Sequence, residues 1–144
     1  MTDERHGYYF QDLEVGTTDV YAKTVTDADI TLFAGISGDT NPVHLDDEFA
    51  AASRFGTRIA HGMLSASYIS TVLGTKLPGP GCIYMGQNLK FMAPVRVGDT
   101  VRARVTVREL IEGKNRAVLD TVCSVGDTVV IEGEAMVWVP SRKE

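Results

Sequence analysis

The sequence predicts an α+β fold in which a curved antiparallel sheet wraps around one central, buried helix. Residues 62–75 contain no charged side chain, and their apolar residues recur at helical spacing. A helix without a charged face is usually buried on most sides. The chain after residue 81 reads as consecutive strands joined by tight polar turns, which is an antiparallel meander. A sheet with one apolar face must be covered, and the uncharged helix is its only good cover.

Length and composition favour one ordinary globular domain, residues 1–144. The chain has 44% hydrophobic and 23% charged residues, with a net charge of −5. An acidic balance argues against a general affinity for nucleic acid or anionic membranes. We find no secretory signal and no apolar run long enough to span a bilayer. The two cysteines are far apart and form no C-x-x-C motif, so we expect no metal site and a reducing cytoplasmic location.

The first third of the chain predicts one strand and two short helices. Residues 17–26 alternate loosely and predict a strand. Thr26 and Asp29 then form a capping-box pattern for a helix that ends near Gly38. A second short helix is expected to begin near Asp46, because acidic residues there suit the positive end of a helix. His44 is therefore expected in the connection between the two helices.

The last third of the chain predicts the sheet. In residues 97–110 apolar and polar side chains alternate, so one face should be buried and the other exposed. An apolar stretch at 81–95, interrupted by Pro94, reads as a long strand at an edge or with a bulge. Two further strands follow, separated by polar turns.

The sequence D-T-N-P-V-H, residues 39–44, carries the strongest functional signal. Asp39 and His44 each have an ordinary structural explanation, at the end of a helix and before the next one, and Asn41 is a common turn former. For either residue alone that explanation is the better one. Two ionisable side chains aimed at one point from such a connection favour a function in proton transfer.

Residues 33–50, 59–67 and 78–101 resemble, in this order, the MaoC-like R-specific enoyl-CoA hydratases of the hot-dog fold. The resemblance implies reversible hydration of a trans-2-enoyl-CoA to an R-3-hydroxyacyl-CoA, with an acyl-CoA thioester as substrate and no metal or redox cofactor. It implies that Asp39 and His44 handle the protons of one water, and that the backbone N–H at or near Gly62 contacts the thioester oxygen. The free N–H groups at the start of the uncharged helix suit that contact.

The resemblance also implies two subunits joined edge to edge, so we expect a homodimer or a higher homo-oligomer. The alternatives are a 3-hydroxyacyl-acyl-carrier-protein dehydratase, an acyl-CoA thioesterase and a non-catalytic acyl-thioester-binding module. Acyl chain length, the choice of carrier and the pathway stay open.

Several other residues have two interpretations, of which the structural one is favoured. His61 either caps the uncharged helix or lines its entrance. Ser65 and Ser67 read as small packing residues, one of which faces the site. A stripe of arginines suits a solvated strand face better than coenzyme A phosphates, and three apolar residues suit core packing as well as an acyl tunnel; these are Arg102, Arg104 and Arg108, and Tyr84, Met85 and Phe91.

Overall fold

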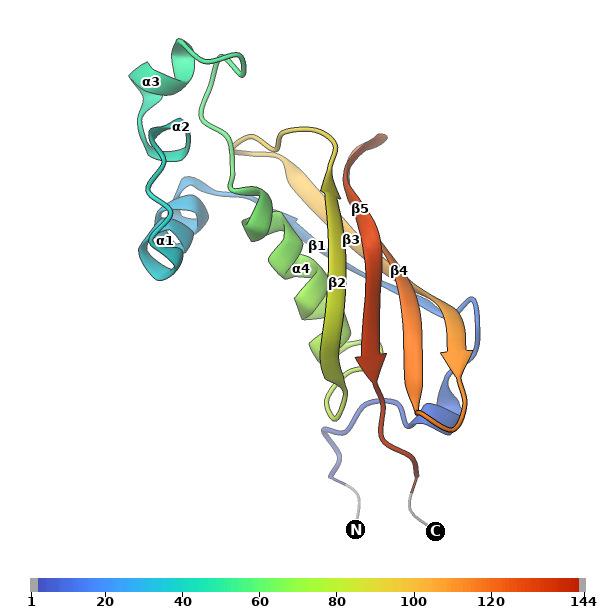
Figure 1. Cartoon of the computed structure of the whole chain (residues 1–144). Coiled ribbons are helices and arrows are strands. Elements are labelled where there is room, and N and C mark those ends of the chain that lie inside the picture. Colours follow the sequence, from blue (N-terminus) through green and yellow to red (C-terminus); the bar gives the residue numbers. More distant parts are fainter. Residues whose placement is uncertain (1–2, 143–144) are drawn as a thin grey trace.

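The computed structural model describes residues 3–142. Five strands form one antiparallel sheet in the order β1-β3-β4-β5-β2 (Figure 1). The strands are β1 (Thr18–Thr24), β2 (Ile83–Phe91), β3 (Thr100–Ile111), β4 (Arg116–Val125) and β5 (Thr128–Trp138). A short 3₁₀ turn, η1 (Phe10–Asp12), precedes β1, and the helices are α1 (Asp27–Ser37), α2 (Pro42–Leu45), α3 (Asp47–Ala51) and α4 (Gly62–Thr75).

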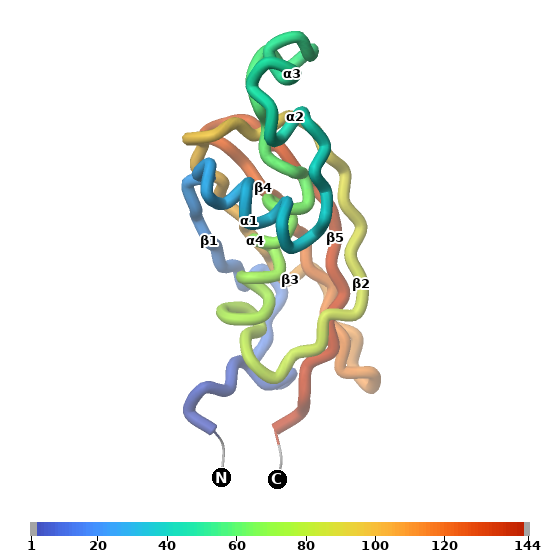
Figure 2. Tube along the Cα trace, turned by 90° about the vertical axis from the view of Figure 1, so that its left-hand side faces the viewer, coloured from blue at the N-terminus to red at the C-terminus, as the bar shows by residue number. Residues whose placement is uncertain are grey.

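The predicted central helix is α4, with the predicted bounds. It contacts β1, β2, β3 and β4, and Figure 2 shows the two edge strands, β1 and β2, on opposite sides of it. Ile69, Val72 and Leu73 on its inner face are at most 1% exposed. The predicted α+β layout, a bent sheet around a helix, is confirmed.

The outer face of α4 departs from the expectation that this helix is buried on most sides. Met63 is 55% exposed, and Ser67 and Ser70 are also exposed. Neither helix α1 nor strand β2 of the same chain covers this face of α4. The uncharged helix therefore has two faces without charge: an apolar inner face that the sheet buries, and a neutral outer face that this chain leaves exposed.

The inner face of the sheet follows the alternation of the sequence. In β3, Val101, Ala103 and Val105 are completely buried, and the intervening Arg102 and Arg104 are exposed. Since successive side chains of a strand point to opposite faces, the apolar set packs on α4 and the arginines face outward. The outward face of the sheet is partly paired: Arg108 lies 2.7 Å from Asp120 and also contacts Glu134.

Helix α1 begins and ends as predicted. The Thr26 hydroxyl accepts a hydrogen bond from the Asp29 N–H at 3.1 Å, and the Asp29 carboxylate accepts one from the Thr26 N–H at 2.9 Å. Lys23 lies 2.6 Å from the same carboxylate, which lowers the Asp29 pKa. Gly38 ends the helix in the left-handed region with φ 78°, a conformation that glycine adopts without strain.

His44 lies between the two predicted helices, α1 and α3, as expected, but the connection itself contains an additional short helix that was not predicted. His44 is the third residue of α2, which starts at Pro42. Proline at the first position of a helix has a suitable φ and lacks only an N–H that would have no intrahelical partner. Asn41 caps this turn by accepting a hydrogen bond from the Val43 N–H at 3.1 Å. The Asn-Pro pair thus starts a helical turn. Helix α3 follows at Asp47, close to the predicted start near Asp46, and Asp46 is its cap.

Among residues 3–142, no helix combines the length and the apolar character that crossing a bilayer requires.

Candidate functional site

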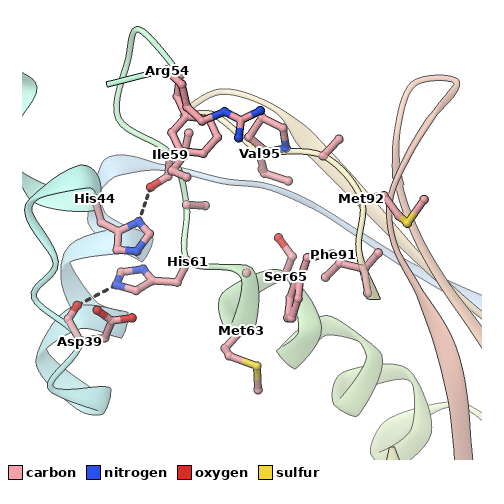
Figure 3. Close-up of a pocket in the computed structure, with 16 residues that line it drawn as sticks. Asp39, His44, Arg54, Ile59, His61, Met63, Ser65, Phe91, Met92 and Val95 are labelled. Atoms are coloured by element: carbon pink, nitrogen blue, oxygen red, sulfur yellow. Dashed lines mark hydrogen bonds between the residues drawn. The ribbon is translucent and has the colours of Figure 1, made fainter. Parts of the chain in front are cut away.

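A pocket of about 560 Å³ lies beside the N-terminal end of α4 (Figure 3). One wall comes from the loop after α1 and from α2. Another comes from the end of β2 and from residues 92–95, which follow it. Its polar lining is Asp39, His44, Arg54, His61 and Ser65, and its remaining lining is mostly apolar. The pocket therefore brings together residues that lie more than twenty positions apart in the chain.

His44 is held in a defined orientation. Its side chain is 8% exposed, and its Nδ1 lies 2.8 Å from the Ile59 carbonyl oxygen. A carbonyl oxygen can only accept a hydrogen bond, so Nδ1 carries the proton of the neutral ring. This leaves Nε2 with a free lone pair, as a general base requires.

Asp39 lies on the loop that follows α1 and is exposed to solvent. A carboxylate oxygen of Asp39 and one ring nitrogen each of His44 and His61 lie within 4.8 Å of one another. The loop is shaped by short-range bonds: the Asp39 N–H donates to the Ser37 hydroxyl at 3.1 Å, and the Asn41 N–H to the Asp39 carboxylate at 3.3 Å. The structure thus brings Asp39 and His44 to one pocket.

His61 lines the pocket, which is the less favoured of its two interpretations from the sequence. Its ring is 2% exposed and stacks on the His44 ring, with centroids 3.8 Å apart. Its side chain makes no capping bond to α4, so the capping interpretation is not supported. The only signal in the sequence was its position, directly before a helix that reads as buried.

Gly62 is the first residue of α4. No hydrogen bond joins its N–H to another residue in the range 3–142. A Cβ at this position would lie 2.6 Å from an edge atom of the Phe91 ring. The space beside Gly62 is occupied by the Phe91 ring, at the border of the pocket.

Ser65 and Ser67 of α4 lie in different environments, as expected. Ser65 lines the pocket, is 1% exposed, and its hydroxyl has no hydrogen-bond partner among the described residues. Ser67 lies outside the pocket and donates its hydroxyl to the Leu64 carbonyl. Tyr84 and Met85 line a second groove, of about 550 Å³, between α4 and β2.

The Asp39, His44 and His61 side chains also offer a set of atoms that resembles a zinc ligand set. A zinc ion would lie about 2.0–2.1 Å from each imidazole nitrogen, in the plane of each ring. The two rings are stacked with an interplanar angle of 26°, so their planes do not meet at that distance. A metal bound to both imidazole rings would therefore require the rings to turn.

The chain matches the family model described as MaoC-like domain over residues 13–129. It is 54% identical over 144 residues to the 3-hydroxybutyryl-CoA dehydratase of Methylorubrum extorquens, covering 100% of this chain and 92% of that protein. It is 56% identical over 135 residues to the (R)-specific enoyl-CoA hydratase of Rhodospirillum rubrum, covering 94% of each. The solved structure of the (R)-hydratase from A. caviae superimposes with a TM-score of 0.88 at 46% identity, covering 90% of this chain and 99% of that one.

Proposed function

We propose, from the premise that this chain belongs to the MaoC-like domain family, that it is an R-specific enoyl-CoA hydratase. The enzyme is a hydro-lyase with the hot-dog fold. It adds water reversibly across the double bond of a trans-2-enoyl-CoA and forms an R-3-hydroxyacyl-CoA. A relative that is 56% identical is named (R)-specific enoyl-CoA hydratase, and one that is 54% identical is named for the reverse direction, as a 3-hydroxybutyryl-CoA dehydratase.

The observation that carries the proposal is a pocket that combines a carboxylate, an oriented imidazole and a helix start. Hydration needs a base for the water, a proton for the α-carbon and a donor for the thioester oxygen. His44 Nε2 is free to take a proton from water because Nδ1 is bound to the Ile59 carbonyl. Asp39 lies within reach of the same water and orients it. The proton that this pair removes from the water is delivered to the α-carbon, so the hydroxyl and the proton added to the double bond both come from one water.

The start of α4 supplies the third requirement. Negative charge grows on the thioester oxygen in the transition state, and donors placed in advance stabilise that charge. The Gly62 N–H donates to no other residue within the described range 3–142, and it lies at the positive end of the dipole of a 14-residue helix. We assign the contact with the thioester oxygen to this N–H.

An assay with crotonyl-CoA separates this function from the alternatives. Loss of the enoyl absorbance without release of free thiol supports hydration, and release of thiol indicates a thioesterase. Thioester binding without either signal indicates a binding module. Turnover of the corresponding acyl-carrier-protein substrate, but not of crotonyl-CoA, would favour the carrier-protein dehydratase. Chiral analysis of the product tests the R configuration.

We propose further that the protein forms a homodimer through strand β2. This strand is at the edge of the sheet, and its Ile83, Tyr84 and Met85 are 57%, 40% and 47% exposed. An exposed apolar edge strand is usually paired or covered. The neighbouring groove and the open, uncharged face of α4 extend the same surface. A second copy paired at β2 would cover all three features.

We also propose that residues 1–144 act as one domain in the cytoplasm. A single cluster of buried side chains runs from Phe10 to Val139, which supports one domain. Cys82 and Cys123 are both free thiols, which agrees with a reducing compartment.

A further inference from the structure

We propose that His61 is a positioning residue of the active site, which fixes Asp39 through its backbone and His44 through its ring. This inference rests on the proposed hydratase function and deepens it. His61 would act through its two neighbours, without itself exchanging a proton with substrate.

The first support is a hydrogen bond between parts of the chain that are distant in sequence. His61 Nε2 lies 2.9 Å from the Asp39 carbonyl oxygen, so the N-terminal end of α4 is tied to the loop after α1. Figure 3 shows this bond beside the Asp39 carboxylate. Asp39 is otherwise held by short-range bonds within its own loop. Gly62 follows His61 directly, so one residue sets the position of the carboxylate relative to the Gly62 N–H.

The second support is the packing of the ring. His61 stacks on His44 at 3.8 Å on one side and contacts the Phe33 ring at 4.8 Å, tilted by 56°. Together with the Nδ1 bond of His44 to the Ile59 carbonyl, the stack leaves the His44 ring little freedom to turn. An imidazole whose plane is fixed keeps its Nε2 lone pair directed at one place in the pocket, which lowers the entropic cost of the reaction geometry.

These contacts assign opposite tautomers to the two histidines. The Asp39 carbonyl can only accept, so His61 carries its proton on Nε2; its Nδ1 is buried with no partner among the described residues. His44 carries its proton on Nδ1 by the same reasoning. A further proton on His61 Nδ1 would be buried without an acceptor and adjacent to the ring that must receive a proton during catalysis.

The tautomers can be measured on the wild-type protein at neutral pH by long-range ¹H–¹⁵N NMR of the imidazole rings. The chain has only three histidines, so variants at each position assign the signals. We expect Nε2–H for His61 and Nδ1–H for His44. A His61 signal of the Nδ1–H form, or of the doubly protonated ring, would overturn the proposal whether or not the protein is a hydratase.

Two variants separate positioning from packing. His61→Gln keeps an N–H donor that can reach the Asp39 carbonyl but removes the ring stack. His61→Phe keeps a stacked ring but removes the donor. We expect His61→Phe to lower kcat by about tenfold to a hundredfold with KM unchanged, since a displacement of about 1 Å in a reacting group can cost a hundredfold. His61→Gln should recover at least half of that loss on a logarithmic scale.

The matched control is His6→Phe, which changes a histidine stacked on Tyr9, outside the pocket; its kcat should equal that of wild type. Equal kcat in all variants, or equal losses in both His61 variants that follow their melting temperatures, would overturn the proposal. If His61→Phe does not fold, the His61→Gln kinetics and the wild-type tautomers decide. A wild-type protein without hydratase turnover would instead refute the proposed function, and the tautomer measurement would still test the geometry.

Discussion

Gly62→Ala tests most directly whether the start of α4 takes part in the reaction. The added Cβ would lie 2.6 Å and 2.7 Å from two atoms of the Phe91 ring, while carbon atoms normally rest about 3.5–4.0 Å apart. The ring edge must therefore move by about 1 Å. Phe91 is 52% exposed and lines the pocket, so it can turn, but its movement changes the pocket beside the Gly62 N–H.

The expected cost falls on turnover and leaves stability nearly unchanged. Turning Phe91 away from its preferred rotamer costs about 0.5–1.5 kcal/mol, and replacing a helical glycine by alanine stabilises by about 1 kcal/mol. These two terms nearly cancel in the free energy of unfolding. A displacement of about 1 Å at the site lowers kcat/KM by up to about a hundredfold. We expect a loss between tenfold and a hundredfold.

Two variants in the same helix serve as controls. A Cβ added at Gly74 would meet no atom within 4 Å, so Gly74→Ala should raise the melting temperature and leave kcat/KM unchanged. Leu73 is 1% exposed, so Leu73→Ala should destabilise the fold by about 2–5 kcal/mol, with normal turnover in the fraction that stays folded. Steady-state kinetics with crotonyl-CoA and thermal melts on the same preparations give both quantities. Wild-type kcat/KM in folded Gly62→Ala would refute the role given to this helix start.

Three further outcomes are expected. Asp39→Asn and His44→Gln should each remove most of the turnover while the melting temperature stays within a few degrees of wild type; near-normal turnover in either folded variant would exclude that residue from the mechanism. Light scattering at micromolar concentration should give at least twice the chain mass of 15.6 kDa, and Met85→Lys should shift it toward the monomer; a monomeric wild type would contradict the proposed edge pairing. Because its bonds to Lys23 and the Thr26 N–H lower the pKa of Asp29, its stabilising contribution is present above the ordinary carboxyl pKa of about 4 and is lost as the pH falls below it. The stability difference between wild type and Asp29→Asn should therefore shrink in acid, and a difference that is constant from pH 7 to pH 3 would show that this carboxylate is not held as described.

The sequence by itself determined the elements whose signals are local. The capping box of Thr26 and Asp29, the left-handed Gly38 and the uncharged stretch of α4 each involve residues within one helix, where neighbours are a few positions apart. The alternation of β3 predicted its buried face for the same reason. The spacing of Asp39 and His44 around Asn-Pro indicated a site, although it did not reveal that Pro42 would start a helical turn containing His44.

Only the tertiary structure decided which distant residues meet. His61 lies 17 positions after His44, a separation that does not correspond to a helical or strand period. The two rings stack because the fold brings α2 next to the start of α4, where His44 also bonds to the Ile59 carbonyl. The Phe91 ring reaches Gly62 because β2 runs along α4. The sequence also did not predict that one face of α4 is exposed in the single chain. A helix without charged residues is usually buried on most sides. Its composition does not tell whether the chain's own sheet or a second molecule covers each face.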